Sequence, residues 1–304
     1  MIGDGFARRI DENKVLKALL PGCGEPKCGL ARRAWRRLRC WDAGIRLFDA
    51  CFCDPRCLEK ALCRRFEEAC RREISLPRIE HRIPLGLILL SRGQLSNAQL
   101  RLALESQSQG CHQPIGQCLE KLGFAAEHQI TAALAQQWAC PVLTTKLVPD
   151  RRALQWVPFR ILESSRMVPL RFVESTRILH MAFADGIDYV ALYALREMLN
   201  CEAEACLVSR SAMDAALESL SSENVSGDFL FESWRTAADM ARVTCSYALK
   251  LDAEQVKIVS CGRTIWARLT GQDNTSHLLF RHPASFQMPI PELEEPVHSF
   301  RHAG

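Results

Sequence analysis

The sequence lacks the short motifs that mark the common hydrolytic enzymes. No G-x-x-x-x-G-K-[ST] phosphate-binding loop occurs in its 304 residues, which excludes a P-loop nucleotide hydrolase. The G-x-S-x-G turn of serine hydrolases and the H-E-x-x-H helix of zinc proteases are also missing. The eight histidines are scattered, and none indicates a cysteine–histidine nucleophile. We therefore expect a protein that is not an enzyme.

The sequence also has few long apolar runs. The longest near its centre, IPLGLILL, is far too short to cross a bilayer, so we expect no transmembrane segment. The N-terminal stretch MIGDGFARRIDENK is charged and lacks the apolar region of a secretory signal. Fifteen cysteines without such a signal indicate a reducing compartment, where thiols stay free or bind metal. These features predict a cytoplasmic location.

The chain does contain an internal repeat with a constant offset of thirty residues. The first copy reads PLGLILLSRGQLSNAQLRLALESQ, and the second reads PIGQCLEKLGFAAEHQITAALAQQ. The matched pairs are Pro84 with Pro114, Leu85 with Ile115, Gly86 with Gly116, Leu89 with Leu119, Gly93 with Gly123, Leu100 with Ile130, Leu104 with Leu134 and Gln107 with Gln137.

Each copy predicts two short helices around a glycine. The proline suits the start of the first helix, and Gly93 stands where a helix favours a left-handed residue at its end. Ser96 with Gln99 forms a capping box for the second helix, whereas the second copy has Ala126 in the place of the serine. A plain helical hairpin repeat explains the leucines and glycines. It does not explain why both copies end in glutamine.

At these residues the chain resembles the MshEN-type domain, the N-terminal domain of type II secretion and type IV pilus assembly ATPases. That family carries two copies of R-L-G-x-x-L-(V/L)-x-x-G-(L/I)-(V/L)-x-x-x-x-L-x-x-x-L-x-x-Q. The resemblance implies cyclic di-GMP as ligand, one half per copy, and a secretion or pilus-type protein partner. It implies that apolar side chains cover the guanine faces and that the glutamines meet guanine edges. The implied ligand-binding residues are Leu85, Gly86, Leu89, Gly93, Leu100, Leu104, Gln107, Ile115, Gly116, Leu119, Gly123, Ile130, Leu134 and Gln137.

The chain departs from the family motif at its leading arginine, which is Pro84 in one copy and Pro114 in the other. A lost charge-assisted hydrogen bond is worth about 1.5–3 kcal/mol, which corresponds to binding roughly 10–100-fold weaker. Arg82 and His112, also thirty residues apart, stand two positions upstream and are candidate substitutes. The alternative is a decayed site, in which case the domain serves only as a protein–protein docking module.

Eight of the fifteen cysteines fall within residues 1–80. The pairs Cys23–x4–Cys28 and Cys53–x3–Cys57 have ligand-like spacing and predict a structural zinc site. The phrase GIRLFDACFCDPRC resembles the strand–knuckle–helix edge of treble-clef-like zinc modules. Cys40 and Cys51 are rival ligands. The alternative is that the cysteines are small apolar residues buried in a helical cap.

The same segment is basic. Residues 1–82 hold 19 lysines and arginines against 12 acidic residues, and the run ARRAWRRLR covers 31–39. Such a run favours a solvated helix face, with an anionic partner such as nucleic acid as the weaker alternative. A zinc-dependent nucleic-acid binder is therefore a further hypothesis.

The rest of the chain alternates strand and helix patterns. PVLT, MVPLRFV, ILHMAFA and EAEACLV read as strands of a small α/β layer, and this part resembles the second half of the same domain. Asp185 and Asp188 are interpreted as a turn residue and a helix cap. We predict an α+β multidomain protein: a Cys-rich N-terminal segment (1–80), an MshEN-type domain with a helical tandem-motif subdomain followed by a small α/β subdomain (81–221), a small α+β C-terminal unit of a helix and a hairpin (222–287), and a disordered tail (288–304).

Overall fold

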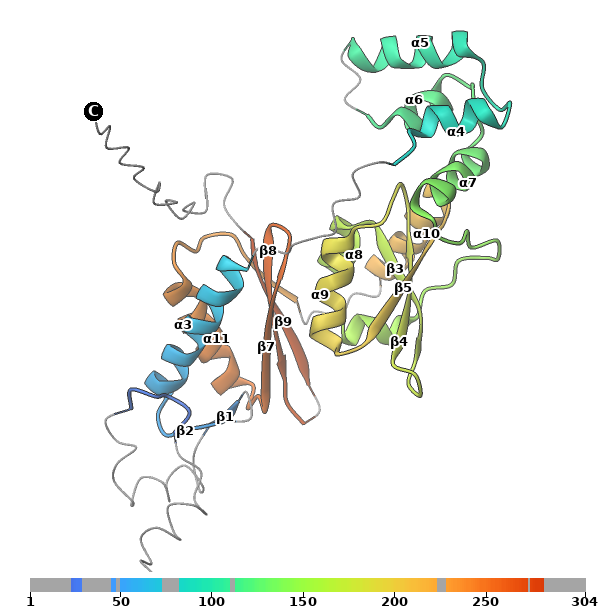
Figure 1. Ribbon diagram of the computed structural model, residues 1–304. Helices are drawn as coiled ribbons and strands as arrows, with labels where there is room; N and C mark the ends of the chain where they lie inside the picture. The colour runs from blue at the N-terminus through green and yellow to red at the C-terminus, as the bar shows by residue number, and fades with distance from the viewer. Residues whose placement is uncertain are drawn as a thin grey trace, which may run out of the picture.

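The computed structural model describes residues 23–28, 45–47, 50–72, 82–109, 113–222, 228–272 and 274–281 (Figure 1). His112, Cys40, the basic run 31–39 and the predicted tail lie outside these residues. The helices are α3 (Pro55–Arg71), α4 (Leu85–Ser91), α5 (Asn97–Ser108), α6 (Ile115–Lys121), α7 (Glu127–Trp138), α8 (Phe159–Ser164), α9 (Tyr189–Leu199), α10 (Arg210–Ser222) and α11 (Ala237–Lys250), with the 3-10 helix η1 (Arg151–Gln155). The strands are β1 (Ile45–Leu47), β2 (Ala50–Phe52), β3 (Met167–Val173), β4 (Ile178–Phe183), β5 (Glu202–Leu207), β6 (Asp228–Phe231), β7 (Gln255–Cys261), β8 (Thr264–Thr270) and β9 (Thr275–Arg281).

The tandem copies form the four helices α4 to α7, at one end of the molecule beyond α10 (Figure 1). The predicted glycine turns are confirmed, with φ of 66° at Gly93 and 69° at Gly123. After each glycine, a backbone N–H bonds the carbonyl five residues earlier, at 3.0 and 2.9 Å. The Ser96–Gln99 capping box is also confirmed. In the second copy the Ala126 methyl can accept no hydrogen bond, so only half of the box remains.

The copies exchange partners when they pack. Helix α4 of the first copy lies against α7 of the second, and α6 of the second lies against α5 of the first. Their apolar faces form one small core that includes Leu89, Ala103, Leu119 and Ala133. Neither copy could bury its leucines without the other.

The following residues form a three-stranded sheet in the order β3-β4-β5. β3 and β4 pair antiparallel, and β4 and β5 pair parallel across α9. Asp188 caps α9 by accepting from the Ala191 N–H at 3.0 Å, as predicted. The predicted strand PVLT is wrong: this stretch makes only a single bridge, between Val142 and Leu207. Val142 and Leu143 are half-buried against the core, but the flanking Pro141 and residues 144–146 are exposed, so little packing supports a longer strand.

The C-terminal unit is a four-stranded sheet in the order β6-β9-β8-β7. The predicted hairpin is confirmed as β7 with β8, and the predicted third strand is β9. Strand β6 was not predicted; it runs parallel to β9 at the sheet edge. Figure 1 shows this sheet between α3 and α11 on one side and α8 and α9 on the other. Both of its faces therefore contribute to hydrophobic cores.

Helix α3 of the Cys-rich segment lies alongside α11 and packs on the C-terminal sheet. Leu62 and Phe66 are fully buried in the same core as Ile265 and Phe280. The sequence analysis predicted residues 1–80 and 222–287 as separate units. The described parts of both ranges share one hydrophobic core. None of the helices in the described ranges is long and apolar enough to span a membrane.

The shared core can be tested at Phe66 and Phe280, whose rings meet edge to face with centroids 5.4 Å apart. We predict that Phe66→Ala lowers the free energy of unfolding by about 3–5 kcal/mol, because it leaves a cavity. In a double-mutant cycle with Phe280→Ala, measured by urea unfolding, the coupling should be about 0.5–1.5 kcal/mol. Leu249→Ala, at an exposed position of α11, should change stability by less than about 0.5 kcal/mol. Zero coupling would contradict the shared core.

Candidate functional site

A pocket of about 360 Å³ lies where the tandem copies meet the α/β sheet. Its walls include Pro84 from the first copy and Pro114 from the second, the two positions where the family motif has arginine. Six predicted ligand residues also line it: Leu85, Ile115, Gly116, Ile130, Leu134 and Gln137. Most of the apolar wall thus comes from the second copy.

Polar groups that the sequence analysis did not identify line the rest of the pocket. Gln117, Glu120 and Glu127 come from the second copy, while Asp185 and Arg210 come from the α/β part. Arg210 forms an ion pair with Asp185, and both side chains are roughly one-third exposed. The pocket therefore combines three carboxylates with one guanidinium, within reach of an apolar wall.

Two hydrogen bonds fix the second copy to the start of α10. The Glu127 carboxylate accepts from the Ser211 N–H and from the Ser211 hydroxyl, each at 2.7 Å. One wall of the pocket is thereby tied to the other. No sequence signal connects Arg210 or Ser211 with the repeat, because they lie more than seventy residues beyond it.

The two repeat glutamines have partners within the protein. Gln107 Nε2 donates to the Gln113 carbonyl at 2.8 Å, and Gln137 Nε2 donates to the Ile83 carbonyl at 2.7 Å. Each acceptor directly precedes the proline that opens the other copy. The glutamines therefore close a reciprocal pair of contacts between copies, and their amide donors are not directed at a guanine edge. Only Gln137 lines the pocket.

The expected pair of matched ligand surfaces is not what the structure shows. Leu89 and Leu119 are fully buried in the core between the copies, and Gly93 and Gly123 are exposed at helix ends. Leu104 is 48% exposed. The predicted ligand residues outside this pocket are Arg82, Gly86, Leu89, Gly93, Leu100, Leu104, Gln107, Leu119 and Gly123. The pocket is one-sided because the α/β part covers the second copy.

Arg82, a candidate substitute for the missing arginine, lies elsewhere. Its guanidinium stacks over the Trp138 ring, 3.2 Å from the centroid. Trp138 also contacts Tyr189 and lies so close to Gly186 that a Cβ there would meet the indole at 2.5 Å. Arg82 therefore anchors the start of the first copy to the end of the second, rather than facing the pocket.

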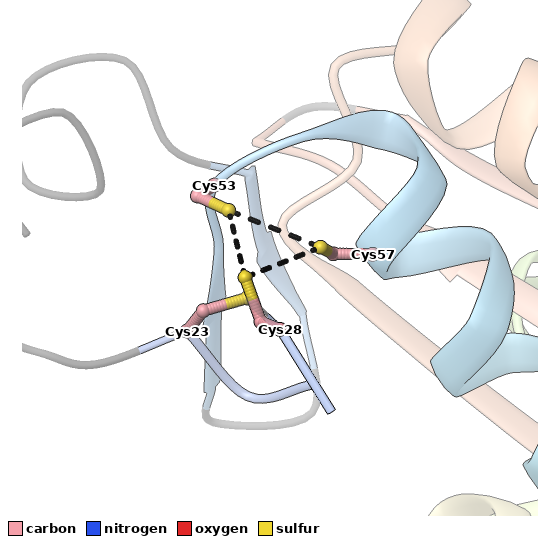
Figure 2. A group of neighbouring side chains, drawn as sticks. All are labelled: Cys23, Cys28, Cys53 and Cys57. Carbon is pink, nitrogen blue, oxygen red and sulfur yellow. Dashed lines mark hydrogen bonds between the residues drawn. The ribbon is translucent and has the colours of Figure 1, made fainter. Parts of the chain in front are cut away.

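Figure 2 shows a second candidate site, formed by Cys23, Cys28, Cys53 and Cys57. The sequence predicted these four cysteines as zinc ligands, and their sulfur atoms lie within 4.8 Å of one another. Burial first, and then the thiols of Cys28 and Cys23, raise the pKa of Cys53 to about 12. A cation among the sulfurs would favour their thiolate forms, as zinc does. The rival Cys51 is buried in β2 and is not part of this group.

Comparisons with known proteins give matches among solved structures only. No family model matches the chain, and no curated protein matches it. A structure of MshE with cdg is similar over 46% of this chain and 99% of its own, with 26% identity and a TM-score of 0.39. A structure of the N-terminal domain of XpsE is similar over 44% of this chain and 92% of its own, with 22% identity and a TM-score of 0.35. A second crystal form of that domain covers 46% of this chain and 98% of its own, with 22% identity and a TM-score of 0.28.

Replacing glutamine with glutamate should have different effects on stability at the adjacent positions Gln137 and Gln136, because Gln137 donates a hydrogen bond and Gln136 accepts one. Gln137→Glu replaces a donor with a carboxylate facing the Ile83 carbonyl, so we expect a loss of about 1 kcal/mol in the free energy of unfolding at neutral pH. The opposed carbonyl raises the folded-state pKa of the new carboxyl. The loss should therefore shrink as the pH falls through this raised folded-state pKa, where the protonated group can donate again, and it should be gone below the unfolded-state pKa of about 4.3.

The matched control is Gln136→Glu. Gln136 Oε1 accepts from Arg92 at 2.7 Å, and a carboxylate keeps that acceptor and adds opposite charge. This variant should be neutral or slightly more stable in the same urea titrations. Equal destabilisation by both variants would show that the Gln137 contact has no specific role.

Proposed function

We propose that the chain is a non-enzymatic, cytoplasmic regulatory protein whose tandem-motif domain binds cyclic di-GMP. The observation that carries this proposal is the pocket at the second copy, which joins the predicted apolar wall to carboxylates and an arginine. The ligand's occupancy is passed to a secretion or pilus-type protein partner. We choose cyclic di-GMP as the ligand because the duplicated motif resembles the MshEN-type motif.

The pocket has the groups that a guanine base requires. Ile115, Ile130 and Leu134 provide apolar surface for a flat ring. A carboxylate such as Glu120 accepts hydrogen bonds only, and guanine presents its exocyclic N2 amine as a donor. Arg210 can donate in pairs to guanine O6 and N7, or to a phosphate. The three carboxylates that line the pocket repel phosphate groups, so we expect the guanine base to enter the pocket and the phosphates to stay outside it.

Binding would change how two parts of the protein contact each other. Arg210 is paired with Asp185, so a ligand that recruits the guanidinium competes with that ion pair. The pocket wall formed by α7 is tied to α10 through Glu127 and Ser211. A ligand between them therefore affects how the tandem helices are held on the α/β sheet. This is the step through which a partner would detect occupancy.

A docking module is the second candidate function, because the first copy exposes several large apolar side chains. Leu87 is 51% exposed, Leu102 54% and Leu104 48%. Such side chains suit a protein partner whether or not a ligand binds. The third hypothesis, nucleic-acid binding, depends on the basic run 31–39, which lies outside the described residues and stays a prediction from sequence.

The ligand proposal is tested by titration calorimetry of the full chain with cyclic di-GMP. We expect saturable binding with a Kd at or below tens of micromolar. Arg210→Ala should weaken cyclic di-GMP binding roughly 10–100-fold, because a lost charge-assisted hydrogen bond is worth about 1.5–3 kcal/mol. Arg152→Ala, which removes the same charge from an exposed residue outside the pocket, should leave the Kd unchanged.

Cyclic di-AMP distinguishes a guanine site from a general anion site, because adenine lacks the N2 donor. Binding of both ligands with equal affinity would contradict recognition of the guanine edge. Absence of heat with folded protein would leave docking as the function of this domain.

A further inference from the structure

We propose that Cys23, Cys28, Cys53 and Cys57 bind one structural zinc ion, and that this ion fastens residues 23–28 to the start of α3. This site is independent of the nucleotide pocket. It explains how a short, cysteine-rich stretch with little core of its own is held against the C-terminal sheet.

The sulfur positions match a tetrahedral thiolate site. Four sulfurs about 2.3 Å from a central zinc ion stand about 3.8 Å from one another. The measured separations are 3.6 Å between Cys28 and Cys53, 3.9 Å between Cys53 and Cys57, and 3.8 Å between Cys57 and Cys28 (Figure 2). Cys23 Sγ lies within 4.8 Å of all three. A disulfide would require about 2.05 Å, so the sulfurs are spaced for a shared ion and not for a bond.

Each ligand pair comes from a defined local structure. Residues 23–28 make a tight turn, closed by a hydrogen bond from the Cys28 N–H to the Glu25 carbonyl at 3.0 Å. The turn pairs with β2, where the Gly24 N–H donates to the Cys51 carbonyl at 2.8 Å. A side chain at Gly24 would place its Cβ 2.6 Å from the Ala50 Cβ. Glycine at this position therefore lets the first ligand pair approach the hairpin.

The second pair lies at the start of a long helix. Asp54 is the N-cap of α3, accepting from the Arg56 N–H at 2.8 Å, and Cys57 follows in the first turn. Cys53 directly precedes the cap. The N-terminus of a helix carries partial positive charge, which stabilises thiolates placed beside it. Helix geometry alone would be a weak argument, but here it coincides with the convergence of four sulfurs from two segments.

An ion pair supports the same arrangement from outside the sulfur cluster. The Glu25 carboxylate, only 2% exposed, lies 2.6 Å from the Arg64 guanidinium on α3. This pair joins the turn between the first two cysteines to the helix that carries the last. Tetrahedral sites of four thiolates select zinc or iron among the common metals, and closed zinc sites of this kind are structural.

The proposal is tested by elemental analysis of the full chain, expressed with zinc in the medium and purified under reducing conditions. We expect about one zinc per chain and negligible iron. Cys57→Ser should weaken zinc affinity by more than the roughly 10–100-fold that loss of an outer-shell partner costs, so after washing with a chelator its zinc content should fall well below one per chain. Cys63→Ser is the control: Cys63 lies on the same helix, is partly buried and is outside the cluster, so its zinc content should stay at that of the unaltered chain.

A second measurement separates loss of the site from loss of folding. Cobalt(II) added to metal-stripped, reduced chain should give the thiolate charge-transfer and intense visible bands of a tetrahedral sulfur site, and zinc should abolish them. Gly24→Ala should keep these bands but weaken cobalt affinity, since it only displaces the turn. Iron in place of zinc, disulfides among the four cysteines in the reduced chain, or equal zinc in Cys57→Ser and Cys63→Ser would each overturn the proposal.

Discussion

The structure depends on a sheet that cannot expose either face to water. Strands β8 and β9 are buried over most of their length, and the inner residues of β8, Ile265, Trp266 and Ala267, are fully inaccessible. Such strands lack the alternation of apolar and polar residues that a half-exposed sheet shows. Helices must therefore cover both sides. α3 and α11 cover one, and α8 and α9 cover the other, which brings the two ends of the described chain together around its last strands.

This constraint connects regions that look unrelated in the sequence. The cysteine cluster sets the start of α3, and α3 contributes Leu58, Leu62 and Phe66 to the core on one face of the sheet. On the other face, Lys257 of β7 donates to the Met198 carbonyl at the end of α9 at 3.0 Å. α9 belongs to the same α/β part that forms one wall of the pocket. The cysteine cluster and the pocket are thus joined through one continuous set of packed elements.

Features set by local chemistry could be predicted from the sequence. Gly93 and Gly123 end their helices in the left-handed conformation, Ser96 and Asp188 cap theirs, and the four cysteines converge. Each of these depends on a residue and its neighbours within a few positions, or on a ligand chemistry with few solutions. The same reasoning gave β3, β4, β5 and the β7–β8 hairpin.

Features set by distant pairing could not be predicted. Strand β6 has four residues and owes its structure to β9, more than forty positions later. Arg210 reaches the pocket only because α10 starts beside the second copy. The glutamines carried a real signal, since both copies keep them, but the sequence could not say that the carbonyls of Ile83 and Gln113 use their donors. A repeated residue can reflect contact between repeats as well as contact with a ligand.

The crossed arrangement of the four tandem helices also bears on how such a repeat arises. Each copy supplies the surface and the hydrogen-bond acceptor that its twin lacks, so half of the unit has no stable fold by itself. An ancestral polypeptide with one motif would have needed a sister molecule to complete it. Joining two such copies in one chain by gene duplication would replace that homodimer and free the halves to diverge. The buried seam had to remain alike in both, while the outer surfaces could specialise, one against the body of the protein and the other toward the outside.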